Sequence, residues 1–226
     1  MASESAYAAA GVDIAAGDRA VELMKDAVAR SHRPEVLGGL GGFAGFFDAS
    51  ALARYRHPVL ATSTDGVGTK VAIAGAMGVY DTIGFDLIGM LVDDLVVTGA
   101  EPLFVTDYIA CGKVYPERIA AIVGGIAAAC TAAGASLLGG ETAEHPGLLG
   151  TEEFDIAGAT TGVVEFDEIC RSIGADSLGY ISIEGLTAST GISGRKLCRA
   201  CFDGVYPVPI PAGRALQMGL EQSRGN

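Results

Sequence analysis

An octapeptide in the first third of the chain carries the residue types of a nucleotide-phosphate site. It follows an apolar run at 59–62 and reads Ser63-Thr64-Asp65-Gly66-Val67-Gly68-Thr69-Lys70. The Asp65 carboxylate is a hard oxygen ligand that can hold Mg²⁺. Gly66 and Gly68 let backbone N–H groups approach phosphate oxygens, and Lys70 can neutralise phosphate charge. The alternative interpretation is a simple tight turn, since the chain contains no G-x-x-x-x-G-K-[ST] P-loop.

Further carboxylates lie near the ends of predicted core elements. Asp86 and Asp93 are seven residues apart in an apolar segment, which places them within about 20° of one another on a helix. A narrow solvent-facing stripe is one interpretation of these acids, and the border of a cleft is the other. Asp65, Asp94 and Glu141 all lie at or near element ends. Because gathered carboxylates repel unless a cation holds them, these three predict a Mg²⁺ site.

The segment at 37–47 holds too many glycines for a regular element. It predicts a flexible or ligand-shaped loop around Gly41 and Gly42. Residues 39–44 formally match the G-x-G-x-x-G/A dinucleotide fingerprint, but no apolar strand precedes them and no helix opens from them. A Rossmann oxidoreductase is therefore disfavoured.

Composition narrows the class of protein. The chain has 226 residues, half of them hydrophobic, which excludes a disordered protein, and its net charge of −12 disfavours nucleic-acid binding. The start of the chain shows no basic segment followed by an apolar core, and the apolar stretches elsewhere are interrupted by glycine and acids. We therefore expect a cytoplasmic protein with no membrane partner. The five cysteines, an odd number, are expected to be reduced thiols.

Hydrophobic periodicity predicts alternating helices and strands. The predicted helices cover 12–31, 81–98 and 116–134, and the predicted strands cover 59–64, 103–110, 136–138 and 154–164. Pro116 suits the first position of its helix, and glycines follow the last two helices. This order predicts an α+β fold, a sheet with helices packed on one face, followed by an irregular or helical tail.

Several segments, in order, resemble the phosphoribosylformylglycinamidine cyclo-ligase (aminoimidazole ribonucleotide synthetase) family in its N-terminal half. The resemblance covers about residues 7–165, and its segments are 10–14, 33–43, 63–70, 81–84, 99–103, 107–108, 110–113 and 139–144. It implies a mixed sheet, homodimers that pair through their sheets, and ATP-dependent closure of the purine imidazole ring. In that reaction ATP activates the formyl oxygen of formylglycinamidine ribonucleotide, an internal amine attacks, and phosphate leaves.

The resemblance also implies roles for particular residues. Mg²⁺ and nucleotide would be held by Asp65, Asp94 and Glu141, and the loop around Gly41 and Gly42 would cover them. Phosphate contacts would come from Gly66, Gly68, Thr69 and Lys70. The family pattern has Asn where this chain has Asp93, which adds a charge at that position.

Residues 166–226 differ from the second domain of that family. Segments 173–180 and 197–204, with the pair Cys198 and Cys201, resemble the C-terminal end of amidophosphoribosyltransferases, whose iron–sulfur members use this C-x-x-C. The other cluster ligands and the nucleophilic cysteine have no counterpart, so we expect neither a metal cluster nor transferase activity. The predicted division is an ATP-binding domain at 1–165 and a tail at 166–226. We expect a cyclo-ligase of weakened activity; the alternatives are an inactive nucleotide-binding or dimerisation module and a transferase fragment.

Overall fold

The computed structural model describes residues 10–39, 41–42 and 44–172. Its elements, in chain order, are α2 (Ile14–Ser31), β1 (Val36–Leu37), β2 (Phe46–Phe47), the 3₁₀ helix η1 (Ala49–Arg54), β3 (Pro58–Gly66), α3 (Lys70–Met77), α4 (Ile83–Val96), β4 (Glu101–Cys111), α5 (Pro116–Ala133), β5 (Ser136–Glu144), β6 (Phe154–Glu165) and α6 (Phe166–Ser172). Every helix and strand predicted from periodicity is present. The interpretations that fall on 173–226, including those of Cys198 and Cys201, lie outside the described residues.

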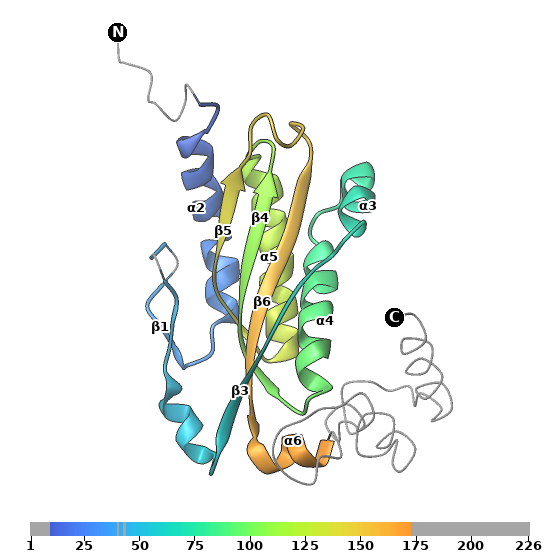
Figure 1. The fold of residues 1–226 in the computed structure, drawn as a ribbon. Coiled ribbons are helices and arrows are strands. Elements are labelled where there is room, and N and C mark those ends of the chain that lie inside the picture. Colours follow the sequence, from blue (N-terminus) through green and yellow to red (C-terminus); the bar gives the residue numbers. More distant parts are fainter. Residues whose placement is uncertain (1–9, 40, 43, 173–226) are drawn as a thin grey trace, which may run out of the picture. The chain divides into compact units, whose positions relative to one another are not determined.

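Four strands form one sheet in the order β3-β6-β4-β5. β4 and β5 are parallel, with a register shift between Val105 and Thr106, and β6 runs the opposite way (Figure 1). The sheet is therefore mixed, and α3, α4 and α5 lie on one of its faces (Figure 1). This confirms the predicted α+β class.

Exposure alternates along β4 as expected for a strand with one covered face. The buried row is Leu103, Val105, Asp107, Ile109 and Cys111, while the residues between them are at least partly exposed. Asp107 thus occupies a position that the pattern reserves for apolar side chains.

The chain divides into two compact units, each with its own core. The larger comprises the segments up to residue 51, 62–92 and 102–161, and its core includes Val28, Leu87, Leu91, Ile119, Ile122 and Ile126. The smaller comprises 52–61, 93–101 and the segment from residue 162, and Leu95, Ala100 and Val164 form its core. The predicted boundary at residue 165 falls between β6 and α6 and remains a prediction.

α2 and α5, the two longest helices of the larger unit, pack on each other. Pro116 opens α5, and Gly134 ends it in the left-handed conformation, at φ 72°. α5 has the length and apolar composition of a membrane span, but half of it is buried inside the protein, as in a core helix. α2 begins at Asp13, whose side chain accepts a hydrogen bond from Ala16 N at 3.0 Å.

Glu144, at the end of β5, fixes the start of α2. Its carboxylate accepts hydrogen bonds from Asp13 N at 2.7 Å and from Val114 N at 2.6 Å. One side chain therefore joins the first turn of α2 to the loop after β4. This contact holds α2 along the edge strand β5.

Three local predictions need correction. The strand predicted as buried at 59–64 extends over Pro58–Gly66 and is half-exposed, with Leu60 59% exposed, because none of the described helices covers one face of the sheet. The strand predicted at 136–138 continues through its glycines to Glu144. The helix α3 was not predicted, because its small residues give little amphipathic pattern.

Candidate functional site

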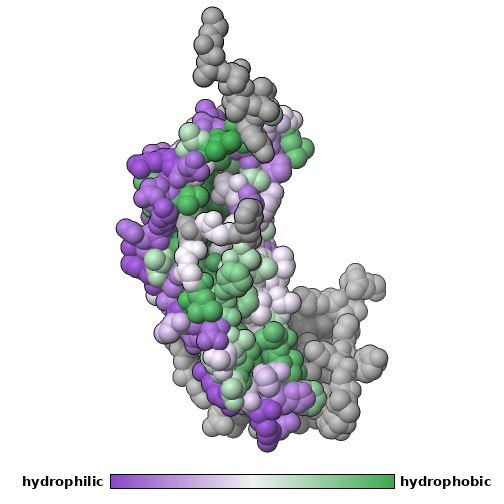
Figure 2. All heavy atoms as spheres, turned by 90° about the vertical axis from the view of Figure 1, so that its left-hand side faces the viewer, coloured by the Kyte–Doolittle hydropathy of each residue, from purple (hydrophilic) through white to green (hydrophobic). Residues whose placement is uncertain are grey.

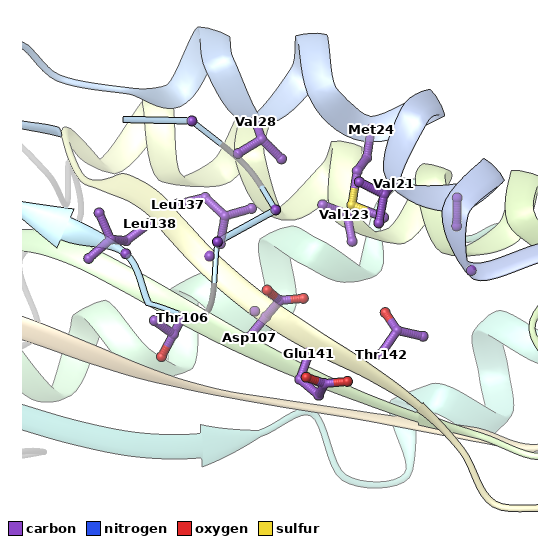
Figure 3. Close-up of a pocket in the computed structure, with 18 of the residues that line it drawn as sticks. Val21, Met24, Val28, Thr106, Asp107, Val123, Leu137, Leu138, Glu141 and Thr142 are labelled. Carbon is purple, nitrogen blue, oxygen red and sulfur yellow. The ribbon is translucent and has the colours of Figure 1, made fainter. Parts of the chain in front are cut away.

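A cavity of about 570 Å³ opens beside the edge strand β5. Apolar residues of α2 and α5, among them Met24, Val28 and Val123, form one wall, and Asp107, Glu141 and Thr142 come from the strands (Figure 3). The view onto the α2 and β5 side shows the surface hollowed next to α2, with hydrophobic side chains in the hollow (Figure 2). The volume suits a small-molecule ligand.

Glycines make up much of the remaining lining. Gly41 and Gly42 come from the loop between β1 and β2, and Gly139 and Gly140 come from β5. Gly41 has φ 106°, a conformation that L side chains rarely adopt. A methyl group on Gly140 would overlap Oδ1 of Asp107. The bare backbone of β5 therefore leaves room for the Asp107 carboxyl at the cavity.

Asp107 is the functional candidate that the sequence prediction missed. Its side chain is directed into the cavity, and the residue is only 9% exposed (Figure 3). Burial raises the pKa of this carboxyl to about 7, although a hydrogen bond from its own backbone N–H acts in the opposite direction. Burial and the nearby Asp107 charge raise the pKa of the Cys130 thiol on α5 to about 12. The signal for this residue in the sequence is an acidic side chain at a position where the alternation along β4 otherwise places apolar residues.

The octapeptide forms the end of β3 and the start of α3. Asp65 Oδ1 accepts a hydrogen bond from Gly66 N at 2.7 Å. Gly68 has φ 56°, Thr69 precedes the helix, and Lys70 is its first residue. The Lys70 ammonium lies 2.8 Å from Asp86 Oδ1, and both side chains are about half exposed. Asp86, whose role the sequence left open, is thus the counterion of Lys70.

The predicted site residues fall in two places within the larger unit. Gly41, Gly42 and Glu141 line the cavity, whereas Asp65 lies on β3, at the opposite edge of the sheet. Three strand spacings separate these edges, about 14 Å at 4.7–4.9 Å each. The structure does not bring Asp65 and Glu141 together, and Asp94 belongs to the smaller unit. In the described part of the chain, no group of three or more His, Cys, Asp or Glu side chains is placed to hold a metal ion.

The sheet face that none of the described helices covers carries a polar pair near the end of β4. The Tyr108 hydroxyl lies 3.1 Å from His145 Nε2, and Tyr108 is 41% exposed. Tyr108 also stands opposite Glu141 in the ladder between β4 and β5. His145, for which sequence reasoning found no role, therefore lies at this end of the sheet.

Residues 47–164, about half of the chain, match the family described as AIR synthase related protein, N-terminal domain. The chain belongs to this family. Residues of both candidate places, Asp65 to Lys70 and Asp107 to Glu141, fall within the matched segment. The predicted resemblance of residues 7–165 is confirmed. The resemblance of segments 173–180 and 197–204 to amidophosphoribosyltransferases remains a prediction.

Individual relatives carry the name predicted for the family. The chain is 49% identical over 219 residues to the phosphoribosylformylglycinamidine cyclo-ligase of Geobacillus kaustophilus (strain HTA426), covering 93% of this chain and 63% of that protein. It is 58% identical over 158 residues to the enzyme of that name from Desulfitobacterium hafniense (strain DSM 10664 / DCB-2), covering 70% of this chain and 46% of that protein. The chain thus spans roughly half to under two thirds of the length of these relatives.

Among solved structures, a thiamine-monophosphate kinase from Stenotrophomonas maltophilia K279a shares the fold. The TM-score is 0.50 at 19% sequence identity, and the alignment covers 63% of this chain and 42% of that chain. At this identity the similarity supports the arrangement of strands and helices alone.

Proposed function

We propose that the chain binds Mg-ATP and takes part in the ATP-dependent ring closure of formylglycinamidine ribonucleotide to aminoimidazole ribonucleotide. The observation that carries the proposal is the 49–58% identity to cyclo-ligases, together with the family match over residues 47–164, which include residues of both candidate places. The glycine-lined cavity beside Asp107 and Glu141 supports it as a small-molecule site.

The turn between β3 and α3 is the proposed phosphate-binding element. Gly66 and Gly68 offer backbone N–H groups without a Cβ, Thr69 offers a hydroxyl, and Lys70 a positive charge. Asp86 holds Lys70 in place until a phosphate competes for it. The loop at Gly41 and Gly42 is the proposed cover over the cavity.

The donor chemistry of this site fits Mg²⁺. This ion prefers oxygen ligands and is usually held by one or two carboxylates together with substrate phosphates and water, so a ready-made cage of three side chains is not required. We propose Asp65, which adjoins the phosphate-binding turn, as the carboxylate that holds this ion; Glu141 at the cavity and Asp94 of the smaller unit are separate candidates that the sequence predicts. When bound with ATP, the ion would neutralise charge on the transferred phosphoryl group.

The proposed reaction is a phosphoryl transfer followed by ring closure. The γ-phosphoryl group of ATP passes to the formyl oxygen, which converts that oxygen into a leaving group. The ribose-linked amidine nitrogen then attacks the formyl carbon, the C–O bond breaks, and inorganic phosphate leaves. The attacking nitrogen loses its proton, so the balance is ATP and substrate to ADP, phosphate, product and one proton.

A phosphate-release assay separates the proposal from its main alternative. With formylglycinamidine ribonucleotide and Mg-ATP, steady phosphate release that depends on the ribonucleotide is expected. An inert module would bind nucleotide, as calorimetry can detect, without releasing phosphate. The absence of both binding and release would contradict the proposed function.

Single substitutions identify the carboxylates that support nucleotide binding. Asp65→Ala is expected to lower Mg-ATP affinity at least about tenfold in calorimetry, because it removes a hard oxygen ligand, and Asp94→Ala is expected to lower it less. Asp26→Ala, which changes an exposed acid on α2 outside the proposed sites, is the control and should leave the affinity unchanged. Unchanged affinity in Asp65→Ala would rule out its assignment.

We propose that the protein is a cytoplasmic homodimer. Its interface would be the sheet face that none of the described helices covers. In the described part of the chain no helix covers this face of β4 and β6 (Figure 1), and Tyr108 on β4 is 41% exposed. Cys111 and Cys130 are buried free thiols, in keeping with a reducing compartment. Tyr108→Arg is expected to shift the chain from dimer to monomer in analytical ultracentrifugation. A wild-type monomer at micromolar concentration would contradict the interface.

A further inference from the structure

Asp107 presents a carboxyl group to the cavity without a cationic partner. Its side chain points into the space enclosed by α2, α5 and β5 (Figure 3). Among the described residues, no Lys, Arg or His side chain forms an ion pair with it. Its own backbone N–H is its hydrogen-bonding partner. A carboxylate that is nearly buried and has no cationic partner loses its hydration and gains no opposite charge in return.

The surroundings of Asp107 specify what could serve as a partner. The α2 residues that line the cavity are uncharged, as are those from the glycine-rich loop. Glu141 of β5 is the other titratable residue that lines the cavity, and Cys130 of α5 interacts electrostatically with Asp107; neither carries positive charge. A phosphate placed beside these groups would be repelled. A ligand group with N–H donors and positive charge would be attracted.

We propose that Asp107 binds the amidine group of the formylglycinamidine substrate, with its carboxylate oxygens accepting the amidine N–H groups. The inference rests on the proposed function and assigns one end of the substrate to the cavity. An amidinium is planar, carries positive charge and presents paired N–H groups, which suits bidentate contact with a carboxylate. The missing Cβ of Gly140 gives the carboxyl room to face this ligand.

This arrangement would discriminate the amidine from the amide. Formylglycinamide ribonucleotide differs by an oxygen in place of the imino nitrogen, so it lacks the positive charge and one donor. The carbonyl oxygen of the amide would face the Asp107 carboxylate. Because both groups only accept hydrogen bonds, no hydrogen bond could form between them. A site built to accept N–H donors rejects such an analogue because its own buried acceptor is left unpaired.

The experiment compares the affinities of the two ribonucleotides by calorimetry at pH 8 in the presence of a non-hydrolysable Mg-ATP analogue. Wild-type protein is expected to bind the amidine at least about tenfold more tightly than the amide, the range for hydrogen bonds to charged groups. Asp107→Asn, nearly identical in shape, is expected to reduce this preference to below about threefold. Asp26→Asn makes the same change at an exposed position of α2 outside the cavity and should keep the wild-type preference.

Affinity for the Mg-ATP analogue alone is the internal reference, and Asp107→Asn is expected to leave it within about twofold. If Asp107→Asn keeps the tenfold preference, the inference is wrong while the proposed function stands. If Asp107→Asn does not fold, the wild-type comparison still decides, since equal affinities for the two ribonucleotides would overturn the inference. A wild-type protein that binds neither ribonucleotide nor the nucleotide contradicts the proposed function itself.

Discussion

Replacing Gly125 with alanine is expected to lower the free energy of unfolding of the larger unit by about 3 kcal/mol or more. Gly125 lies buried in α5, and a methyl group there would overlap the backbone oxygen of Asp81. On the other side of the contact, a methyl group on Gly84 would overlap the backbone nitrogen of Ile126. Because backbone atoms on both sides define this approach, no side-chain rotation relieves the overlap. Urea unfolding followed by far-UV circular dichroism measures the loss.

Gly124→Ala is the matched control for this prediction. Gly124 lies in the same helix, directly before Gly125, and a methyl group there meets nothing within 4 Å. Alanine is favoured over glycine inside a helix by about 1 kcal/mol, so the control variant should equal or exceed wild-type stability. Equal unfolding midpoints for Gly125→Ala and Gly124→Ala would show that α4 and α5 do not approach as closely as described.

Local signals in the sequence predicted most of the fold. Pro116 and Gly134 mark the two ends of α5, because proline suits the first turn of a helix and glycine tolerates the left-handed conformation that ends it. Alternation of exposed and buried residues identified β4 and β6. The start of α2 was predicted less well. The sequence predicted the helix from residue 12, whereas it begins at Ile14, because Asp13 caps it with a side chain that accepts a hydrogen bond from a free N–H group of the first turn.

The arrangement of the site could not be predicted in the same way. Neighbouring strands in the order β3-β6-β4-β5 are mostly not consecutive in the chain, so no local pattern shows that Asp65 and Glu141 occupy opposite edges. The side of the sheet on which Asp107 lies depends on which face the helices cover, and this is a property of the whole packing. The glycines at 139–140 looked like the end of a strand, whereas they are its interior and line the cavity.

The burial of Asp107 has a consequence for stability that can be measured without any ligand. A carboxyl with a pKa of about 7 in the folded state and about 4 when unfolded binds an extra proton in the folded state between these values. The free energy of unfolding therefore falls as pH rises through this window, and above about pH 7 it has fallen by the full amount that the pKa difference allows. Below the unfolded pKa both states are protonated, and the loss disappears. Between pH 5 and pH 8 the loss is about 3 kcal/mol, from 1.36 kcal/mol per pKa unit.

Asp107→Asn should abolish this pH dependence, because the amide carries no titrating proton. Relative to wild type, the variant is expected to gain about 3 kcal/mol in free energy of unfolding on going from pH 5 to pH 8, measured by urea unfolding at both values. Glu141 and Cys130, the other titratable groups near the cavity, are present in both proteins and cancel in the comparison. Asp26→Asn, at an exposed position of α2, should follow wild type at both pH values. Parallel stabilities of wild type and Asp107→Asn would mean that water reaches the carboxyl freely, and the cavity would then be too open to select a ligand through this group.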